Sequence, residues 1–212
     1  MEHTFKILPE EKREFILSAA ARVFAKNGYY HANVAEICKQ AGISNGALYK
    51  YFKNKEAVYR SIFEVMVDTL HSRLFAKHVG SDASVYEIIS EIFRDLVDLA
   101  RTHADFLAIY TDVGSCAMNE LSPSVSRKLE EGARGFWIDL VRKGKETGEI
   151  KKHVMDEAAA YYFDNHLNLL IYSLASRHFD MRLQMYFGSD DEKIADEEKA
   201  RLLMKSVKMI LS

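Results

Sequence analysis

Helix-breaking residues are scarce in this chain, and this scarcity limits the folds open to it more than any other feature. Proline occurs only at positions 9 and 123, and glycine occurs ten times in 212 residues. Apolar residues recur at the three- and four-residue intervals of a helix, and no stretch keeps the two-residue alternation of a strand. Almost half of the residues are hydrophobic, which excludes a disordered or fibrous chain. The sequence predicts an all-α protein of about nine helices.

Signals for helix ends are closely spaced in the first sixty residues. Proline is tolerated at the first helical position, Asn and Ser side chains cap helix N-termini, and Gly adopts the left-handed conformation that ends a helix. Only three residues separate the second predicted helix from the third, which is the spacing of a helix-turn-helix. The predicted starts and stops are, in order, Pro9, Gly28, Asn33, Gly42, Ser44 and Asn54.

Longer helices are predicted after the fourth start. We expect a helix-turn-helix domain at residues 1–53, made of three helices, and a larger helical dimerisation and ligand-binding domain at residues 54–212. In the larger domain, helices are expected from the helix that Asn54 caps, then over about 85–99, 105–118, 122–148, 156–187 and 197–211.

Charge is unevenly distributed along the chain. Residues 1–60 hold ten Lys and Arg against six Asp and Glu, a formal charge of +4, and the remainder carries −6. A basic head on an acidic body is typical of a chain that contacts a polyanion at one end. Cys38 and Cys116 lie in apolar patterns and are interpreted as buried free thiols. Without a signal peptide or a membrane-length apolar run, the chain is expected to be cytoplasmic.

The segment from Gly42 to Glu56 is the most informative part of the sequence. Leu48 and Phe52, four residues apart, are expected to face the first helix, while Asn45 and Tyr49 lie on another face. Gly46 and Ala47 would let the helix backbone approach a groove floor. Asn and Lys side chains hydrogen-bond base edges, whereas hydroxyls and helix N-termini bind phosphates. By spacing alone, a short packing helix in an all-α core remains an alternative.

This segment resembles the signature of the TetR/AcrR family of bacterial repressors. That pattern has fixed positions at Gly, Ile, Ser, Gly, Leu, Tyr, Tyr or His, Phe and Lys, all met between Gly42 and Lys55, and the upstream Ala21, Phe24, Gly28 and Tyr29 also match. The resemblance implies a recognition helix at residues 45–51. It implies base contacts from Asn45, Ala47 and Lys50, and phosphate contacts from Asn33, Ser44, Tyr49, Tyr51 and Lys55.

The resemblance assigns dimerisation and ligand sensing to the C-terminal body. The helix predicted from Asp156 is apolar around nearly its whole circumference, so we expect a second subunit to cover its last side, with Leu170 and Ile171 at the interface. A two-fold homodimer predicts a palindromic operator in double-stranded DNA. Candidate ligand-binding residues are the aromatic residues of the central helices and one histidine, although most such residues simply form the core. They are Phe106, Tyr110, Phe136, Trp137, Tyr162, Phe163 and His166.

The predicted function is a DNA-binding repressor that a small apolar or aromatic ligand releases from its operator. The alternative is a DNA-binding dimer that has no small-molecule inducer and acts through protein contacts. An enzyme is not expected, because no nucleophile–base pair, glycine-rich phosphate loop or metal motif is visible. We therefore expect no cofactor and no metal site, and His166 alone does not make one.

Overall fold

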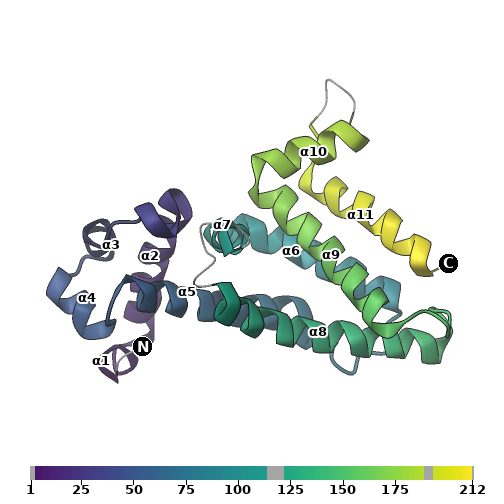
Figure 1. Ribbon diagram of the computed structural model, residues 1–212, viewed down its shortest axis with the longest axis horizontal. Helices are drawn as coiled ribbons and strands as arrows, with labels where there is room; N and C mark the ends of the chain where they lie inside the picture. Colours follow the sequence, from purple (N-terminus) through teal and green to yellow (C-terminus); the bar gives the residue numbers. More distant parts are fainter. Residues whose placement is uncertain (1–2, 114–121, 189–192, 212) are drawn as a thin grey trace. The chain divides into compact units, whose positions relative to one another are not determined.

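The computed structural model describes residues 3–113, 122–188 and 193–211, and these residues form helices without any strand (Figure 1). The all-α prediction is confirmed, and the helix count is close to the predicted one. In chain order the α-helices are α1 (His3–Lys6), α2 (Glu10–His31), α3 (Val34–Ala41), α4 (Asn45–Tyr51), α5 (Lys55–Leu70), α6 (Val85–Thr102), α7 (Ala104–Val113), α8 (Ser122–Thr147), α9 (Asp156–Ala175), α10 (Arg177–Phe187) and α11 (Asp196–Leu211). A π-helical turn, His71–Phe75, and a 3₁₀ turn, Ala76–His78, follow α5.

The helices form two compact units. The first contains the described residues up to Thr69 together with 108–113 and 122–126, and the second contains residues 70–107 and the described part of 127–212. The domain boundary expected between residues 53 and 54 stays a prediction. In the structure α5 begins directly after it, and most of α5 belongs to the first unit.

The core of the first unit is an apolar stripe of α2 that packs with α5. Ile16, Ala19, Ala20, Val23 and Phe24 of α2 are buried, as are Val58, Ile62 and Met66 of α5. Phe15 has the helical spacing of this stripe, but it is 54% exposed and does not belong to the core.

The predicted turns of the first unit are present with the expected hydrogen bonds. The Ala35 backbone N–H donates to Asn33 Oδ1 at 2.8 Å, and the Ala47 N–H donates to Ser44 Oγ at 3.1 Å. Gly42 ends α3 in the left-handed conformation at φ 62°. These local bonds fix the three-residue turn between α3 and α4, because they satisfy backbone groups that helix ends leave without partners.

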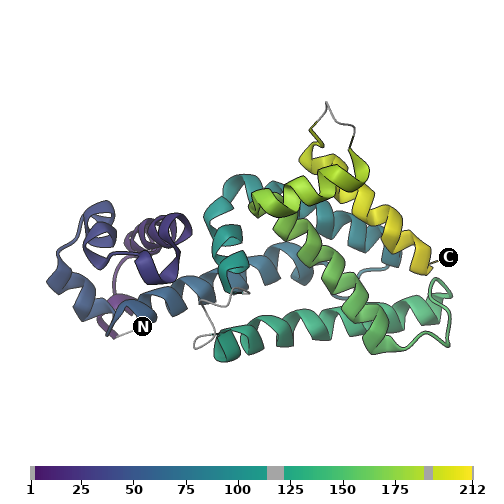
Figure 2. The same ribbon diagram turned by 45° about the horizontal axis from the view of Figure 1, so that its top comes forward.

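The second unit is built around α6, α9 and α11, each of which packs against the other two (Figure 2). A capping box starts α6: Ser84 Oγ accepts from the Glu87 N–H at 3.2 Å, and the Glu87 carboxylate accepts from the Ser84 N–H at 2.9 Å. The core contains fully buried side chains from all three helices, including Ile89, Phe93, Phe163, Leu170 and Val207.

The single helix expected over residues 156–187 is wrong, because the chain breaks between α9 and α10. Ser176 has φ −117° and ψ 122°, which is extended backbone. Lys199 of α11, only 3% exposed, holds the break: its Nζ lies 2.7 Å from Asp180 Oδ1 and 2.8 Å from Asp196 Oδ1. The same ammonium donates to the Ser173 carbonyl at 3.3 Å, so one buried cation joins α9, α10 and α11.

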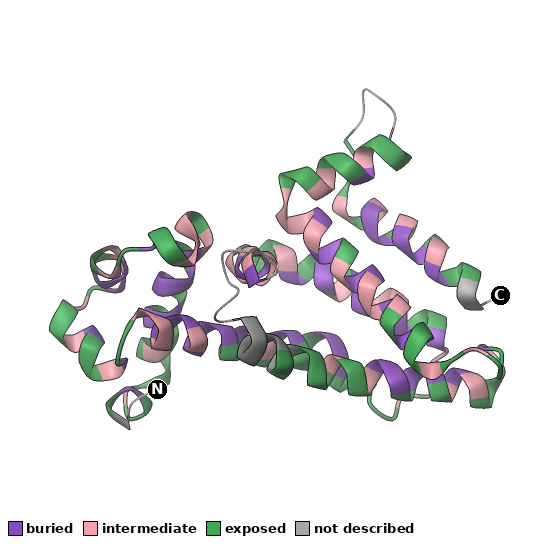
Figure 3. Cartoon of the chain, in the orientation of Figure 1, coloured by how far each residue is buried: buried purple, intermediate pink, exposed green. Residues whose placement is uncertain are grey.

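The break changes which residues face outward. Leu170 and Ile171, expected at a subunit interface, are 0% and 3% exposed within the single chain, so that placement is corrected. A 20-residue helix with neighbours on several sides hides these side chains without a second subunit. Much of α10 is instead exposed (Figure 3), and its outward apolar residues are Met181, Met185, Tyr186 and Phe187.

Two other expectations concern residues 105–118. The helix predicted there corresponds to α7, and its part beyond Val113, with Cys116, lies outside the described residues.

Cys38 is a buried free thiol, as expected, and burial raises its pKa. Among the described helices, none is both long and apolar enough to cross a membrane.

Candidate DNA interface and ligand groove

Helix α4 separates a buried face from an exposed one, as the recognition-helix prediction requires. Leu48 on α4 and Phe52 just after it are 0% exposed, and they anchor the helix to the first unit. Asn45, Tyr49 and Lys50 are exposed, and Tyr49 keeps 53% of its surface accessible. Amide, phenol and ammonium groups therefore lie together on the outer side of one short helix. They suit hydrogen bonding to base edges and phosphates.

The remaining α4 candidates also lie where a DNA groove could approach. Gly46 is exposed, while Ala47 and Tyr51 are partly exposed. Ser44 and Asn33 are exposed N-caps of α4 and α3, so both helix starts lie at the surface of the first unit. Two helix N-termini with polar caps make a suitable surface for phosphate groups.

Lys55 has a structural partner that the sequence did not reveal. Its Nζ donates to the Tyr30 carbonyl at 3.1 Å and to the Ala32 carbonyl at 3.4 Å, and it lies 4.8 Å from the centre of the Tyr29 ring. These bonds tie the start of α5 to the end of α2. In this structure the ammonium stabilises the last turn of α2, where carbonyls lack helical partners.

Five of the seven predicted ligand-binding residues meet in the second unit, mostly as core. Trp137 lies 5.3 Å from Phe136 and 6.2 Å from Phe163 between ring centres, and Tyr162 lies 4.1 Å from His166. Trp137 and Phe163 are 0% exposed. His166 Nδ1 is 2.8 Å from the Tyr162 carbonyl, and burial lowers the pKa of this histidine, which belongs to the core.

The other two candidates belong to α7. Phe106 contacts the His103 ring at 5.2 Å, and Tyr110 lies on the part of α7 that belongs to the first unit. Among the described residues, no group of three or more histidine, cysteine or acidic side chains could hold a metal ion.

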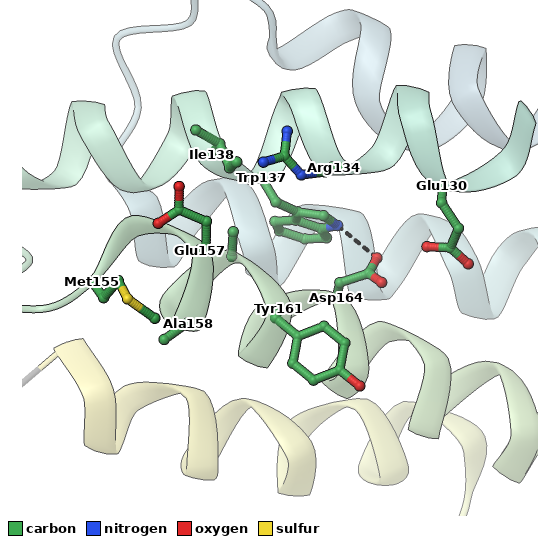
Figure 4. Close-up of a pocket in the computed structure, with 10 residues that line it drawn as sticks. Glu130, Arg134, Trp137, Ile138, Met155, Glu157, Ala158, Tyr161 and Asp164 are labelled. Atoms are coloured by element: carbon green, nitrogen blue, oxygen red, sulfur yellow. Dashed lines mark hydrogen bonds between the residues drawn. The ribbon is translucent and has the colours of Figure 1, made fainter. Parts of the chain in front are cut away.

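A groove of about 530 Å³ opens between α8 and α9 (Figure 4). Of the predicted residues only Trp137 lines it. Apolar side chains dominate the lining, and three carboxyls and one guanidinium stand around it. The lining residues are Glu130, Arg134, Trp137, Ile138, Met155, Glu157, Ala158, Ala160, Tyr161 and Asp164.

Asp164 connects the groove to the aromatic cluster. The Trp137 indole N–H donates to Asp164 Oδ1 at 2.9 Å, and the Asn168 amide donates to Oδ2 at 3.2 Å. Burial raises the pKa of Asp164, and these two hydrogen bonds only partly offset the effect. Partial burial and the nearby Asp164 charge raise the pKa of Glu130. The groove therefore combines an apolar lining with two carboxyls, Glu130 and Asp164, whose pKa values are raised.

Comparison with known proteins identifies the family to which the helix-turn-helix belongs. A model of bacterial regulatory proteins of the tetR family matches residues 16–62, which include α3 and α4. The fatty acid metabolism regulator protein of Bacillus subtilis (strain 168) is 30% identical over 141 residues, covering 65% of this chain and 70% of that protein. The chain belongs to the tetR family. It is a DNA-binding transcriptional regulator with an N-terminal helix-turn-helix.

Further relatives agree with this assignment. The transcriptional repressor KstR2 of Mycobacterium tuberculosis (strain CDC 1551 / Oshkosh) is 27% identical over 140 residues, covering 66% of this chain and 70% of that one. The crystal structure of FadR from Bacillus subtilis in complex with stearoyl-CoA superposes with a TM-score of 0.71 at 20% identity, covering 92% of this chain and 96% of that chain. The tetR-family fold therefore extends over both units.

Asp164 makes a testable contribution to the pH dependence of stability. Because its pKa is raised in the folded state, the stability gained from protonated Asp164 is complete below the unfolded-state pKa of about 4 and is lost as pH rises through the folded-state value. Asp164→Asn keeps the acceptor for Trp137 and removes the titration. We expect the free energy of unfolding to fall less between pH 4 and pH 7 in this variant, as measured by urea titration.

Glu131→Gln, at an exposed position on α8 outside the groove lining, is the control and should follow the wild type. An identical pH profile for Asp164→Asn and the wild type would contradict the assigned cause.

Proposed function

We propose that this regulator is a homodimeric repressor that reads a palindromic operator with α4 and leaves it when an acyl ligand occupies the groove between α8 and α9. The observation that carries the DNA-reading part is the outward presentation of Asn45, Tyr49 and Lys50 over the buried Leu48 and Phe52. Asn45, Ala47 and Lys50 would contact bases, and the caps and phenols would contact phosphates. With DNA as its partner, the protein would act in the cytoplasm.

The dimer surface is proposed on α9 and α10. Met185 is 83% exposed, Tyr186 76%, Met181 55%, and Leu169 of α9 41%. So many large apolar side chains on adjoining helices are costly to leave in water and typical of a subunit interface. Two copies related by a two-fold axis would each present one DNA-reading head, formed by α3, the turn and α4. The two heads would then bind the two symmetric halves of a palindromic operator.

The ligand class is proposed from the groove and the relatives together. A groove of about 530 Å³ with a mainly apolar lining suits an apolar ligand rather than a polar one. The FadR structure was solved with stearoyl-CoA, and the Bacillus subtilis relative is named for fatty acid metabolism. The ligand lowers operator affinity only to the extent that it binds the DNA-free state more tightly than the bound state.

Lys50→Ala tests the reading head. We expect it to reduce discrimination between the operator and a random duplex by about 1–3 kcal/mol, because a side chain that contacts bases carries sequence information. The duplex is one that the wild-type chain selects from a random pool, and affinity is measured by fluorescence anisotropy. Arg22→Ala, at an exposed cation on α2 outside α3 and α4, is the matched control. Equal losses on both duplexes for Lys50→Ala would refute the base contact.

Met185→Glu tests the dimer surface. A buried carboxylate without a partner is strongly unfavourable in an interface, so the variant should sediment as a monomer of about 24.3 kDa while keeping its helical circular dichroism spectrum. Val79→Glu changes another exposed apolar residue, 74% accessible, in the connection before α6 and should remain dimeric. An unchanged dimer in Met185→Glu would place the interface elsewhere.

The single tryptophan can report on the groove, since Trp137 is one of its lining residues. Stearoyl-CoA should change Trp137 fluorescence saturably and release the selected duplex over the same concentration range. Ala158→Phe should block both effects by filling the groove, whereas Lys152→Phe in the connection before α9 should not. Release without any fluorescence change would place the ligand outside the groove. Failure of stearoyl-CoA and shorter acyl-CoAs to release DNA would favour the alternative, a dimer without an inducer.

A further inference from the structure

The segment before α2 packs directly against the recognition helix. We propose that Phe5 and Thr4 of this segment belong to the DNA-reading head as positioning residues, which fix the end of α4 and so set operator specificity. This inference rests on the proposed use of α4 to read bases. It concerns a segment that lies outside the family match, which begins at residue 16.

Helix α4 needs external support because it contains only seven residues. Isolated helices of fewer than about 12 residues are marginal in water, so tertiary contacts must hold this one. Its N-terminal end has the Ser44 cap, whose Oγ accepts from the Ala47 N–H. Its C-terminal end has no comparable side-chain cap of its own, although the Phe52 N–H continues the helical bonding to the Leu48 carbonyl at 2.8 Å.

Phe5 supplies apolar support at that C-terminal end. Its side chain is 1% exposed, and its ring centre lies 4.6 Å from that of Phe52 and 5.7 Å from that of Tyr51. Both pairs are tilted, an arrangement in which aromatic rings attract each other beyond simple burial. Phe5 therefore covers the residue that anchors α4 and also contacts the ring of Tyr51, a candidate phosphate ligand.

Thr4 supplies a polar bond at the same place. Its hydroxyl donates to the carbonyl of Lys50, one of the last-turn carbonyls that a helix leaves without a partner. Lys50 and Tyr51 are consecutive candidates for base and phosphate contacts. Thr4 holds Lys50 through its backbone carbonyl, and Phe5 contacts the ring of Tyr51.

The segment is itself connected to α2. The Leu8 N–H donates to the Phe5 carbonyl at 3.1 Å, and Arg13 Nη1 donates to the Lys6 carbonyl at 3.5 Å. Pro9 then starts α2, its carbonyl accepting from the Lys12 and Arg13 N–H groups at 3.1 Å. Helix α2 thereby orients residues 3–8, which contact α4.

Ile7 provides a matched control because it belongs to the same segment but is 68% exposed. The experiment compares Phe5→Ala and Ile7→Ala in the full chain, using the duplex selected by the wild type and a random duplex of equal length. We expect Phe5→Ala to lower the ratio of the two affinities about tenfold, the scale of losing one good base contact. Ile7→Ala should leave the ratio unchanged.

The random-duplex affinity and its salt dependence separate positioning from simple unfolding. They should change little in Phe5→Ala, because most phosphate contacts come from elsewhere on the head, whereas an unfolded head would lose them. Thr4→Val, nearly equal in volume, removes the hydroxyl without removing the Phe5 ring. It should lower the same affinity ratio by a smaller factor while thermal unfolding stays close to that of the wild type.

The outcomes of these measurements distinguish failure of the positioning role from failure of the proposed function. An unchanged affinity ratio in both Phe5→Ala and Thr4→Val, with a wild-type chain that selects a duplex, refutes the positioning role and leaves the proposed function intact. Equal losses on both duplexes in Phe5→Ala also refute it, because the segment would then only stabilise the fold. If the wild-type chain enriches no sequence from the pool, the proposed function itself fails, and this inference fails with it.

Discussion

The burial of Leu48 and Phe52 is the interaction on which the reading head depends. Two side chains four residues apart, both fully buried, fix the rotation of α4 about its axis. That rotation leaves Asn45, Tyr49 and Lys50 outside, where they can meet DNA. A rotation of about 100°, one residue along a helix, would bury polar groups and expose the anchors. Packing therefore determines which side chains are available for recognition, and propensity alone could not hold so short a helix.

The features that sequence predicted well are those whose cause is local. Asn33 and Ser44 cap helices through bonds to backbone groups two and three residues away, and Gly42 adopts a positive φ that other residues disfavour. The identity and order of these residues are enough to place α3, the turn and α4. By contrast, Phe15 fits the helical period of α2 and is still 54% exposed, because the period alone does not tell which residues the neighbouring helices cover.

The features that sequence missed depend on contacts between distant parts of the chain. No glycine or proline marks the helix break at Ser176 in the sequence. Lys199, which binds Asp180 and the Ser173 carbonyl, comes 23 residues later in the chain. Once α10 turns away, Leu170 and Ile171 become interior and the apolar side chains of α10 become the exposed set. Likewise, the aromatic candidates Trp137, Tyr162 and Phe163 lie close together, but aromatic content cannot tell a filled core from the wall of a groove.

The groove imposes a constraint on how an acyl-CoA could bind. Glu130 and Asp164 lie close enough for their charges to interact, and their pKa values are raised, so this end of the groove resists further negative charge. The phosphates of coenzyme A would be repelled there, while the only cation among the lining residues is Arg134. An acyl chain is neutral and can lie against Ile138, Met155 and Ala160 without that repulsion. The proposed ligand therefore fits with its tail in the groove and its phosphates outside it, away from the two carboxyls.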